Sequence, residues 1–249
     1  DVYWKKDKHL KSFADYLLYI ALFPQLIAGP IVRFRDVANQ IRDRQQFENY
    51  TERLNGAFRF CLGLAKKVLI ANVMAAEVDA IQEIYQSFPY AFDATLAWIM
   101  AIAYTFQIYF DFSGYSDMAI GIARMFGIRL PINFSSPYKS LNIIEFWRRW
   151  HMTLSRFLRD YVYFSLGGSR KGNVRRYINL FTTMLLGGLW HGAGWTFVLW
   201  GGLHGCYLII NHAWQYLKRL ARLEFLDAQP IWRFFCWLLT FTSVVNAWV

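Results

Sequence analysis

Apolar residues are gathered into long stretches that short polar connections separate. Five stretches approach the length of about 20 apolar residues that a helix needs to cross a bilayer, and they cover residues 13–32, 56–78, 94–110, 177–210 and 231–249. Pro24, Gly29 and Pro30 should kink or end the first stretch. Lys66 and Lys67 in the second must reach the interface or line a polar cavity. The pattern predicts an all-α protein that crosses the membrane several times.

The basic connections indicate how these stretches are oriented. Residues 33–53 and 124–176 are rich in Arg and Lys, whereas residues 85–92 carry no charge. Because positive loops stay on the cytoplasmic side, two crossings between the basic regions place both there. The connection after residues 177–210 is also basic, so that stretch should enter and return. This favours a bent or re-entrant pair with its turn near His191, although one tilted crossing fits the length equally well.

Composition supports a membrane protein. Hydrophobic residues make up 56% of the 249 and charged residues only 18%, against about 45–50% and about 25% in soluble domains. The net charge of +10 would suggest nucleic acid in a soluble chain. Beside long apolar runs it indicates loops that face anionic lipid, so we expect a lipid partner and no nucleic acid. We expect residues 1–249 to form one domain of a longer protein, because the chain begins without Met and stops inside an apolar run.

One histidine, His191, lies among glycine and tryptophan in the sequence GGLWHGAGW, residues 187–195. Non-helical backbone at membrane depth is tolerated only where protein or water satisfies it, so His191 should be packed in protein or line a cavity. The glycines then serve close helix packing, with His191 hydrogen-bonded between helices. Alternatively the histidine is functional, because ionisable groups inside a membrane are costly. On its residues alone, the packing interpretation is favoured.

A second segment, EFWRRWHMTLSRFLRDYVYFSLGGSRKG, spans residues 145–172 and contains His151. Its arginines recur at helical spacing beside aromatic residues: Arg148, Arg149, Arg156 and Arg159. This predicts an amphipathic helix at about residues 143–166 that lies on anionic lipid. The arginines are also suited to the phosphates of a cytosolic donor, because a planar guanidinium binds such anions with two hydrogen bonds.

A third segment, residues 110–138, places polar groups where an apolar span should end. Asp111 and Asp117 are six residues apart and do not share a helical face, whereas Asp117 and Arg124 are seven apart and do. The simpler interpretation is an internal ion pair or a helix cap. The functional interpretation is a polar wall for an acceptor, with Asp117 and Asn133 as candidate substrate-binding residues.

Other chemistries have little support in the sequence. His151, His191, His204 and His212 are separated by 40, 13 and 8 residues, which matches no usual zinc spacing, so we predict no metal site. Haem held by two histidines on different helices stays open. Three cysteines without CxxC spacing are interpreted as small buried hydrophobes. A covalent nucleophile has no support, because no GxSxG sequence occurs and no cysteine has an activating context.

Four motifs occur together in a family order. QLIAGPIVRF (25–34), the segments 110–138 and 145–172, and LLGGLWHGAGWTFVLWGGLHG (185–205) resemble the membrane-bound O-acyltransferase family. The resemblance is strongest to its alginate O-acetyltransferase branch, related to the D-alanyl transfer proteins of teichoic acid modification. It implies a helical enzyme of the bacterial inner membrane with a central cavity. It further implies His191 as the catalytic histidine and His151 as a second histidine in a supporting role.

The resemblance implies transfer of an acyl group, acetyl in the nearest branch, from a thioester such as acetyl-CoA. The acceptor would be a hydroxyl of an envelope polysaccharide or a partner protein such as a secreted acetyltransferase, with no further cofactor. A buried imidazole stays neutral and can accept the hydroxyl proton near pH 7. Arg148, Arg149 and Trp190 are candidate substrate-binding residues, and the Trp190 or Trp195 indole or glycine N–H groups are candidate oxyanion donors.

Two functions of other classes compete with this prediction. A transporter or channel would line a pathway with broken helices and intramembrane charges, and a haem or metal oxidoreductase would be coloured or metal-loaded. The pairing of RRWH, ending at His151, with LWHG, around His191, favours the acyltransferase, because a transporter has no reason to combine them. The sequence leaves the acceptor open among alginate, cellulose, peptidoglycan and other polymers.

Overall fold

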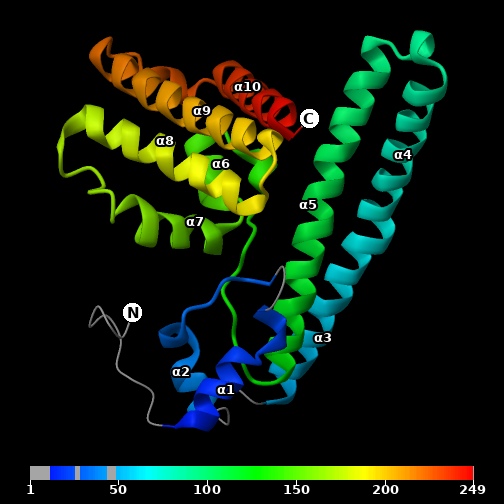
Figure 1. Cartoon of the computed structure of the whole chain (residues 1–249), viewed down its shortest axis with the longest axis vertical. Coiled ribbons are helices and arrows are strands. Elements are labelled where there is room, and N and C mark those ends of the chain that lie inside the picture. The colour runs from blue at the N-terminus through cyan, green and yellow to red at the C-terminus, as the bar shows by residue number, and fades with distance from the viewer. Residues whose placement is uncertain (1–11, 26–28, 44–48, 249) are drawn as a thin grey trace. The chain divides into compact units, whose positions relative to one another are not determined.

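The computed structural model describes residues 12–25, 29–43 and 49–248. Every regular element in these ranges is a helix, which confirms the all-α prediction (Figure 1). Residues 26–28 of the first motif lie outside the described residues. Judged by length and hydropathy together, none of the described helices qualifies as a membrane span. The multi-pass arrangement and the central cavity stay predictions.

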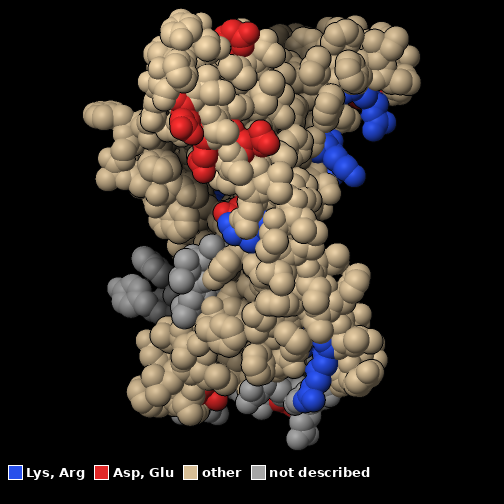
Figure 2. Space-filling view, turned by 90° about the vertical axis from the view of Figure 1, so that its right-hand side faces the viewer, with Lys and Arg blue, Asp and Glu red and all other residues tan. Residues whose placement is uncertain are grey.

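The chain divides into two compact units. The first comprises residues 1–96 and 106–133, and the second comprises residues 97–105 and 134–249. Figure 2 shows one face of the chain, on which uncharged residues far outnumber Lys, Arg, Asp and Glu.

The first unit is built from α1 to α4 and most of α5. The helices are α1 (Phe13–Ile20), α2 (Phe34–Arg42), α3 (Tyr50–Ala65), α4 (Asn72–Ser87) and α5 (Ala94–Met125). Short helical turns lie at Phe23–Gln25 and Pro89–Ala91, and a π-helix at Lys66–Ala71 joins α3 to α4. Polar side chains at the N-caps satisfy free backbone N–H groups, as where Asn49 Oδ1 accepts from Glu52 N at 2.8 Å.

Glycines set the separation between α3 and α5. A Cβ atom on Gly63 would lie 2.5 Å from the Gly114 carbonyl oxygen, and one on Gly56 would lie 2.7 Å from that of Gly121. Both pairs repeat after seven residues, which is about two helical turns, so they line one face of each helix. No larger residue fits these positions without moving the backbones apart.

The polar groups of residues 110–138 form ion pairs across this contact. Asp117 accepts from Arg59 at 2.8 Å and from Lys66 at 2.5 Å. Asp111 lies 2.7 Å from Lys67. The structure therefore supports the ion-pair interpretation, with partners on α3 and the π-helix rather than on the same helix. Both lysines of the predicted apolar stretch have a carboxylate partner.

A third carboxylate, Glu52, forms ion pairs at the end of the α3–α5 contact. Glu52, buried at the first turn of α3, accepts from Arg124 Nε at 2.6 Å and lies 3.2 Å from Arg129. The Arg124 guanidinium, with Arg129, lowers the pKa of Glu52 to about 2, against the opposing effect of burial. Arg124 is thus occupied by Glu52, which explains why it does not pair with Asp117.

The second unit contains the remaining helices. They are α6 (Ile143–Arg149), α7 (Met152–Leu158), α8 (Gly172–His191), α9 (Trp195–Leu220) and α10 (Pro230–Trp248). Shorter turns lie at Pro137–Lys139 and Glu224–Ala228, and a π-helix lies at Arg159–Tyr163. The predicted amphipathic helix at 143–166 is therefore not continuous: it breaks between α6 and α7.

The apolar stretch 177–210 folds as a helical hairpin. Helix α8 ends at His191 and α9 begins at Trp195, which confirms the bent pair with its turn near His191 (Figure 1). Its arms have 20 and 26 residues and extend beyond the stretch 177–210 at both ends. A Cβ atom on Gly201 would lie 2.5 Å from the Met184 carbonyl oxygen. The interior glycines therefore serve close packing of the two arms.

Candidate functional site

His151 occupies the break between α6 and α7. Its backbone has φ +40°, the left-handed region that non-glycine residues rarely adopt. The side chain is 4% exposed, and its ring centroid lies 6.2 Å from that of Phe134. Burial, with the charge of His191 as a lesser cause, lowers the pKa of His151 to about 3. The imidazole is therefore neutral near pH 7.

His191 is the last residue of α8 and sits at the hairpin turn. Its ring lies 5.0 Å from the Trp190 ring and 5.2 Å from the Trp200 ring, edge-on to both. Its side chain is exposed among the described residues. The expectation that His191 is packed in protein or lines a cavity stays a prediction. Gly192 follows in an extended conformation, and a Cβ atom there would collide with the Phe197 ring. The turn thus leaves the imidazole accessible.

The two predicted catalytic histidines lie in the same compact unit. Aromatic rings also connect them: His191 contacts Trp200, Trp200 lies 5.7 Å from Trp248, and Trp248 lies 5.0 Å from Trp150. An exposed imidazole is therefore linked to a buried one through three indole rings, and their joint role in catalysis stays a prediction.

The two predicted arginines differ in their partners. Arg149 is held by Glu145 on the same helix at 2.7 Å, whereas Arg148 is exposed. Arg176 on α8 lies 3.5 Å from His212 Nδ1 on α9. Burial lowers the pKa of His212, and the charges of Arg176 and Arg148 lower it further. Arg148, Arg176 and His212 therefore form a basic cluster contributed by three helices.

The two tryptophans proposed as oxyanion donors and two of the cysteines have exposed side chains. Trp190 is 58% and Trp195 is 86% exposed, so neither indole is enclosed among the described residues. Cys61 and Cys206 are exposed as well, contrary to the prediction that they are buried. Exposure follows from the hairpin geometry for the two tryptophans, because they flank the turn rather than the packed arms.

A buried group that the sequence prediction missed centres on His204. This side chain is fully buried, and its Nδ1 accepts a 3.3 Å hydrogen bond from the Trp147 indole. The Trp200 ring lies 5.0 Å away, four residues earlier on the same helix. The i, i+4 spacing of Trp200 and His204 was the available signal, because it places both on one face of a helix.

The other predicted substrate-binding residues belong to the first unit. Asp117 is engaged by Arg59 and Lys66, and Asn133 is 1% exposed. Their roles in binding substrate stay predictions. Among the described residues, no three side chains of His, Cys, Asp or Glu gather as ligands for a metal ion.

The fold and the site together define an all-helical protein whose second unit pairs an accessible histidine with a buried one. The sequence model of the membrane-bound O-acyltransferase family matches residues 5–245. The chain therefore belongs to the membrane-bound O-acyltransferase family.

Individual relatives agree with this assignment. The chain is 47% identical to a peptidoglycan O-acetyltransferase of Helicobacter pylori over 96% of its length and 44% of the relative. It is 46% identical to the probable alginate O-acetylase AlgI of Pseudomonas syringae over 100% of its length and 45% of the relative. A teichoic acid D-alanyltransferase of Streptococcus thermophilus is 32% identical over 86% of the chain and 54% of the relative. The chain thus spans about half the length of these relatives.

Proposed function

We propose that the whole protein transfers an acyl group, acetyl in the first instance, from a cytosolic thioester to a hydroxyl of an envelope polysaccharide. The enzyme acts in the bacterial inner membrane and transfers the acyl group to the acceptor directly or through a secreted partner protein. The observation that carries the proposal is the accessible His191 imidazole beside the buried, neutral His151. The family assignment and the names of the relatives support the reaction class.

His191 acts in this proposal as the general base. Its imidazole accepts the proton of the acceptor hydroxyl while the oxygen attacks the thioester carbonyl carbon. A C–O bond forms, and the carbonyl oxygen carries the negative charge of the tetrahedral intermediate. Collapse breaks the C–S bond, and the leaving thiolate takes the proton from the imidazolium. General base catalysis of this kind contributes about 10²–10⁴-fold.

His151 positions the base rather than reacting. Because its ring is buried and neutral, it adds no positive charge beside His191. A charged neighbour would disfavour the imidazolium that forms during proton transfer. The exposed Trp190 indole flanks His191 and is placed to contact the incoming acyl chain or acceptor.

The basic cluster of Arg148, Arg176 and His212 supports a phosphorylated donor. Two guanidinium groups from different helices act on the same imidazole. Such a pair suits the phosphate groups of a coenzyme A thioester, which carry several negative charges. Arg149 is already held by Glu145, so we assign it the lesser part in donor binding.

The acceptor class is a polymer of the cell envelope. The relatives are named for peptidoglycan, alginate and teichoic acid. Their common feature is an extracellular polymer that offers hydroxyl groups, and the identities to the first two are similar. We therefore propose a polysaccharide acceptor and leave the polymer to be chosen by experiment.

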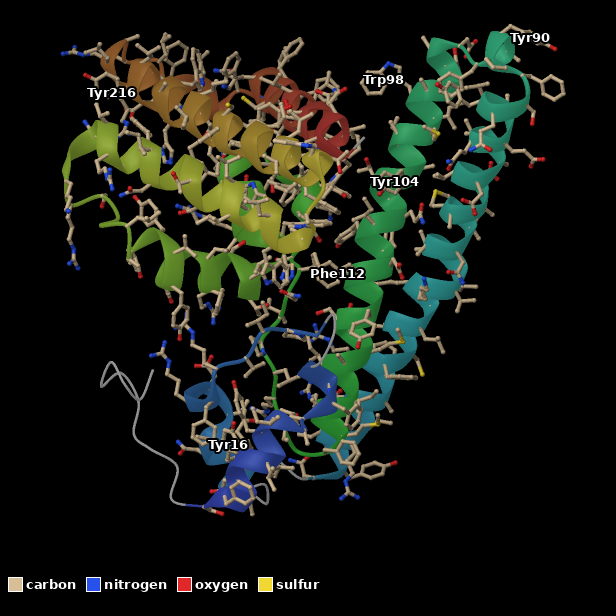
Figure 3. All side chains as sticks on the ribbon, viewed as in Figure 1. Tyr16, Tyr90, Trp98, Tyr104, Phe112 and Tyr216 are labelled. Atoms are coloured by element: carbon tan, nitrogen blue, oxygen red, sulfur yellow. The ribbon has the colours of Figure 1, made fainter. Side chains whose placement is uncertain are left out.

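The assignment is tested by acetyl transfer in the full-length protein with His191→Ala. We expect transfer and thiol release to fall by about 10²–10⁴-fold. Tyr216→Ala is the matched control, because Tyr216 is 62% exposed near the far end of α9 (Figure 3). At about 1.5 Å per residue it lies roughly 30 Å along the helix from the turn. Near-normal turnover in folded His191→Ala protein would refute the role of His191.

A further inference from the structure

Three indole rings surround His204 beside the proposed base. The His204 ring centroid lies 5.1 Å from that of Trp147, 5.0 Å from that of Trp200 and 6.1 Å from that of Trp248. Trp200 also contacts His191 at 5.2 Å, so the group adjoins the reacting centre. No step of the proposed mechanism uses these four side chains.

The hydrogen bond from Trp147 fixes the tautomer of His204. An indole nitrogen donates only, so Nδ1 of His204 must be the acceptor of the 3.3 Å bond. In the neutral imidazole one nitrogen carries hydrogen and the other does not. The proton of His204 therefore resides on Nε2, which makes Nε2 a hydrogen-bond donor.

This leaves three buried donors without an acceptor. Nε2 of His204 and the indole nitrogens of Trp200 and Trp248 are buried and have no hydrogen-bond partner within residues 12–25, 29–43 and 49–248. Leaving a buried donor unsatisfied costs about 1–3 kcal/mol, and buried polar groups in native proteins are nearly always paired. Donors gathered in this way call for an oxygen atom, and no described side chain around them supplies one.

We propose that His204, Trp200 and Trp248 form a donor pocket that binds the carbonyl oxygen of the acyl donor. The proposal rests on the proposed function, because it assigns the position of the thioester beside His191. The carbonyl oxygen gains negative charge when the hydroxyl attacks, and preorganised N–H donors in a dry site stabilise that charge. A buried water molecule would satisfy the same donors, and the experiment separates the two sources.

The experiment uses the full-length protein and a ketone analogue of acetyl-CoA, in which a methylene group replaces the thioester sulfur. The analogue cannot transfer its acetyl group, and a ¹³C label at the carbonyl isolates its infrared stretch. Hydrogen bonding lowers that stretch. We expect a lower wavenumber for the bound analogue than for a simple ¹³C-labelled alkyl methyl ketone in hexane, and a partial return in Trp200→Phe and in Trp248→Phe.

The control variant removes an indole outside the proposed pocket. Trp214→Phe removes an indole farther along α9 and should leave the stretch unchanged. A wild-type stretch equal to that in hexane overturns the pocket without any variant, so the result does not depend on whether the variants fold. A lowered stretch that is identical in wild type and both variants also overturns it, because water or other groups then bind the carbonyl. Absence of analogue binding in wild type would instead refute the proposed function.

A kinetic comparison adds a second readout. Removing one donor to an oxyanion lowers kcat by about 10²–10³-fold in well-studied enzymes. Trp200→Phe should lower kcat toward that range while the KM for the thioester changes little, because the donor interaction strengthens in the transition state. A rise in KM at constant kcat would contradict the assignment.

Discussion

The Trp147 indole donates to Nδ1 of His204 at 3.3 Å, and this bond joins α6 to α9 inside the second unit. It links the segment that carries His151 to the hairpin that carries His191. The same bond decides which nitrogen of His204 holds its proton. One contact therefore serves both the packing of the two histidine segments and the polarity of the proposed donor pocket.

Trp147→Phe should destabilise the protein through this bond. Losing one partner of a buried hydrogen bond costs about 1–3 kcal/mol, because the other partner stays buried and unsatisfied. Thermal unfolding followed by near-ultraviolet circular dichroism measures the effect. Trp195→Phe is the control, since an indole that is 86% exposed should change stability by less than about 0.5 kcal/mol. Equal effects of the two substitutions would argue against the bond.

Gly201→Ala should separate the arms of the hairpin. Its Cβ atom would lie 2.5 Å from the Met184 carbonyl oxygen, so backbone must move, and overpacking of this kind costs about 1–3 kcal/mol. Gly202→Ala is a matched control one residue away, where the nearest atom is a side-chain carbon at 3.7 Å. That change should be neutral or stabilise the helix by up to about 1 kcal/mol. Unfolding temperatures that rank the two variants the other way would contradict the packing.

Arg148→Gln should weaken binding of a phosphorylated donor. Hydrogen bonds to charged groups contribute about 1.5–3 kcal/mol, so the KM for acetyl-CoA should rise about ten- to a hundredfold. Acetyl-pantetheine, which lacks phosphate, should show no such change. Arg219→Gln, at the last turn of α9, controls for loss of one positive charge. A similar rise with both donors would place Arg148 outside phosphate recognition.

Because of the ion pair of Glu52, we expect the folded protein to lose stability in acid. Its pKa is lowered from the ordinary value of 4.5 to about 2, chiefly by the Arg124 hydrogen bond. The unfolded chain therefore binds a proton before the folded chain does. The stabilisation is complete above pH 4.5 and is lost as pH falls toward 2.

The measurement compares wild type with Glu52→Gln across that interval. Wild type should unfold at the higher temperature at pH 7, and the difference should shrink steadily below pH 4.5. Glu83→Gln is a control at an exposed carboxylate of the same unit and should show no such convergence. A constant difference between wild type and Glu52→Gln from pH 7 to pH 3 would contradict the ion pair.

Part of this structure can be predicted from the sequence. Gly and Trp around His191, with basic connections on both sides, predicted the hairpin and its turn. Charge spacing in residues 110–138 predicted an ion pair within that segment. Asp117 instead pairs with Arg59 and Lys66. Local spacing could not show this, because the partners come from a distant part of the sequence. The resemblance of the motifs identified the family and pointed to His191 and His151 as candidate site residues.

Other features leave no local signal. The break at His151 depends on a left-handed backbone, which a histidine does not favour and which neighbouring packing must impose. The accessibility of His191 depends on the turn that follows it, where Gly192 is extended. The role of His204 emerges only when Trp147 on another helix is placed against it.

The left-handed backbone of His151 carries an evolutionary consequence. Glycine adopts φ +40° without the steric cost that a Cβ atom brings, so glycine is the residue that local stability alone would select. Retaining an imidazole there opposes that selection. His151 is thus a position where a drift toward a sturdier fold would erase the site, and sequences that have lost the activity should be recognisable by glycine or asparagine at this break.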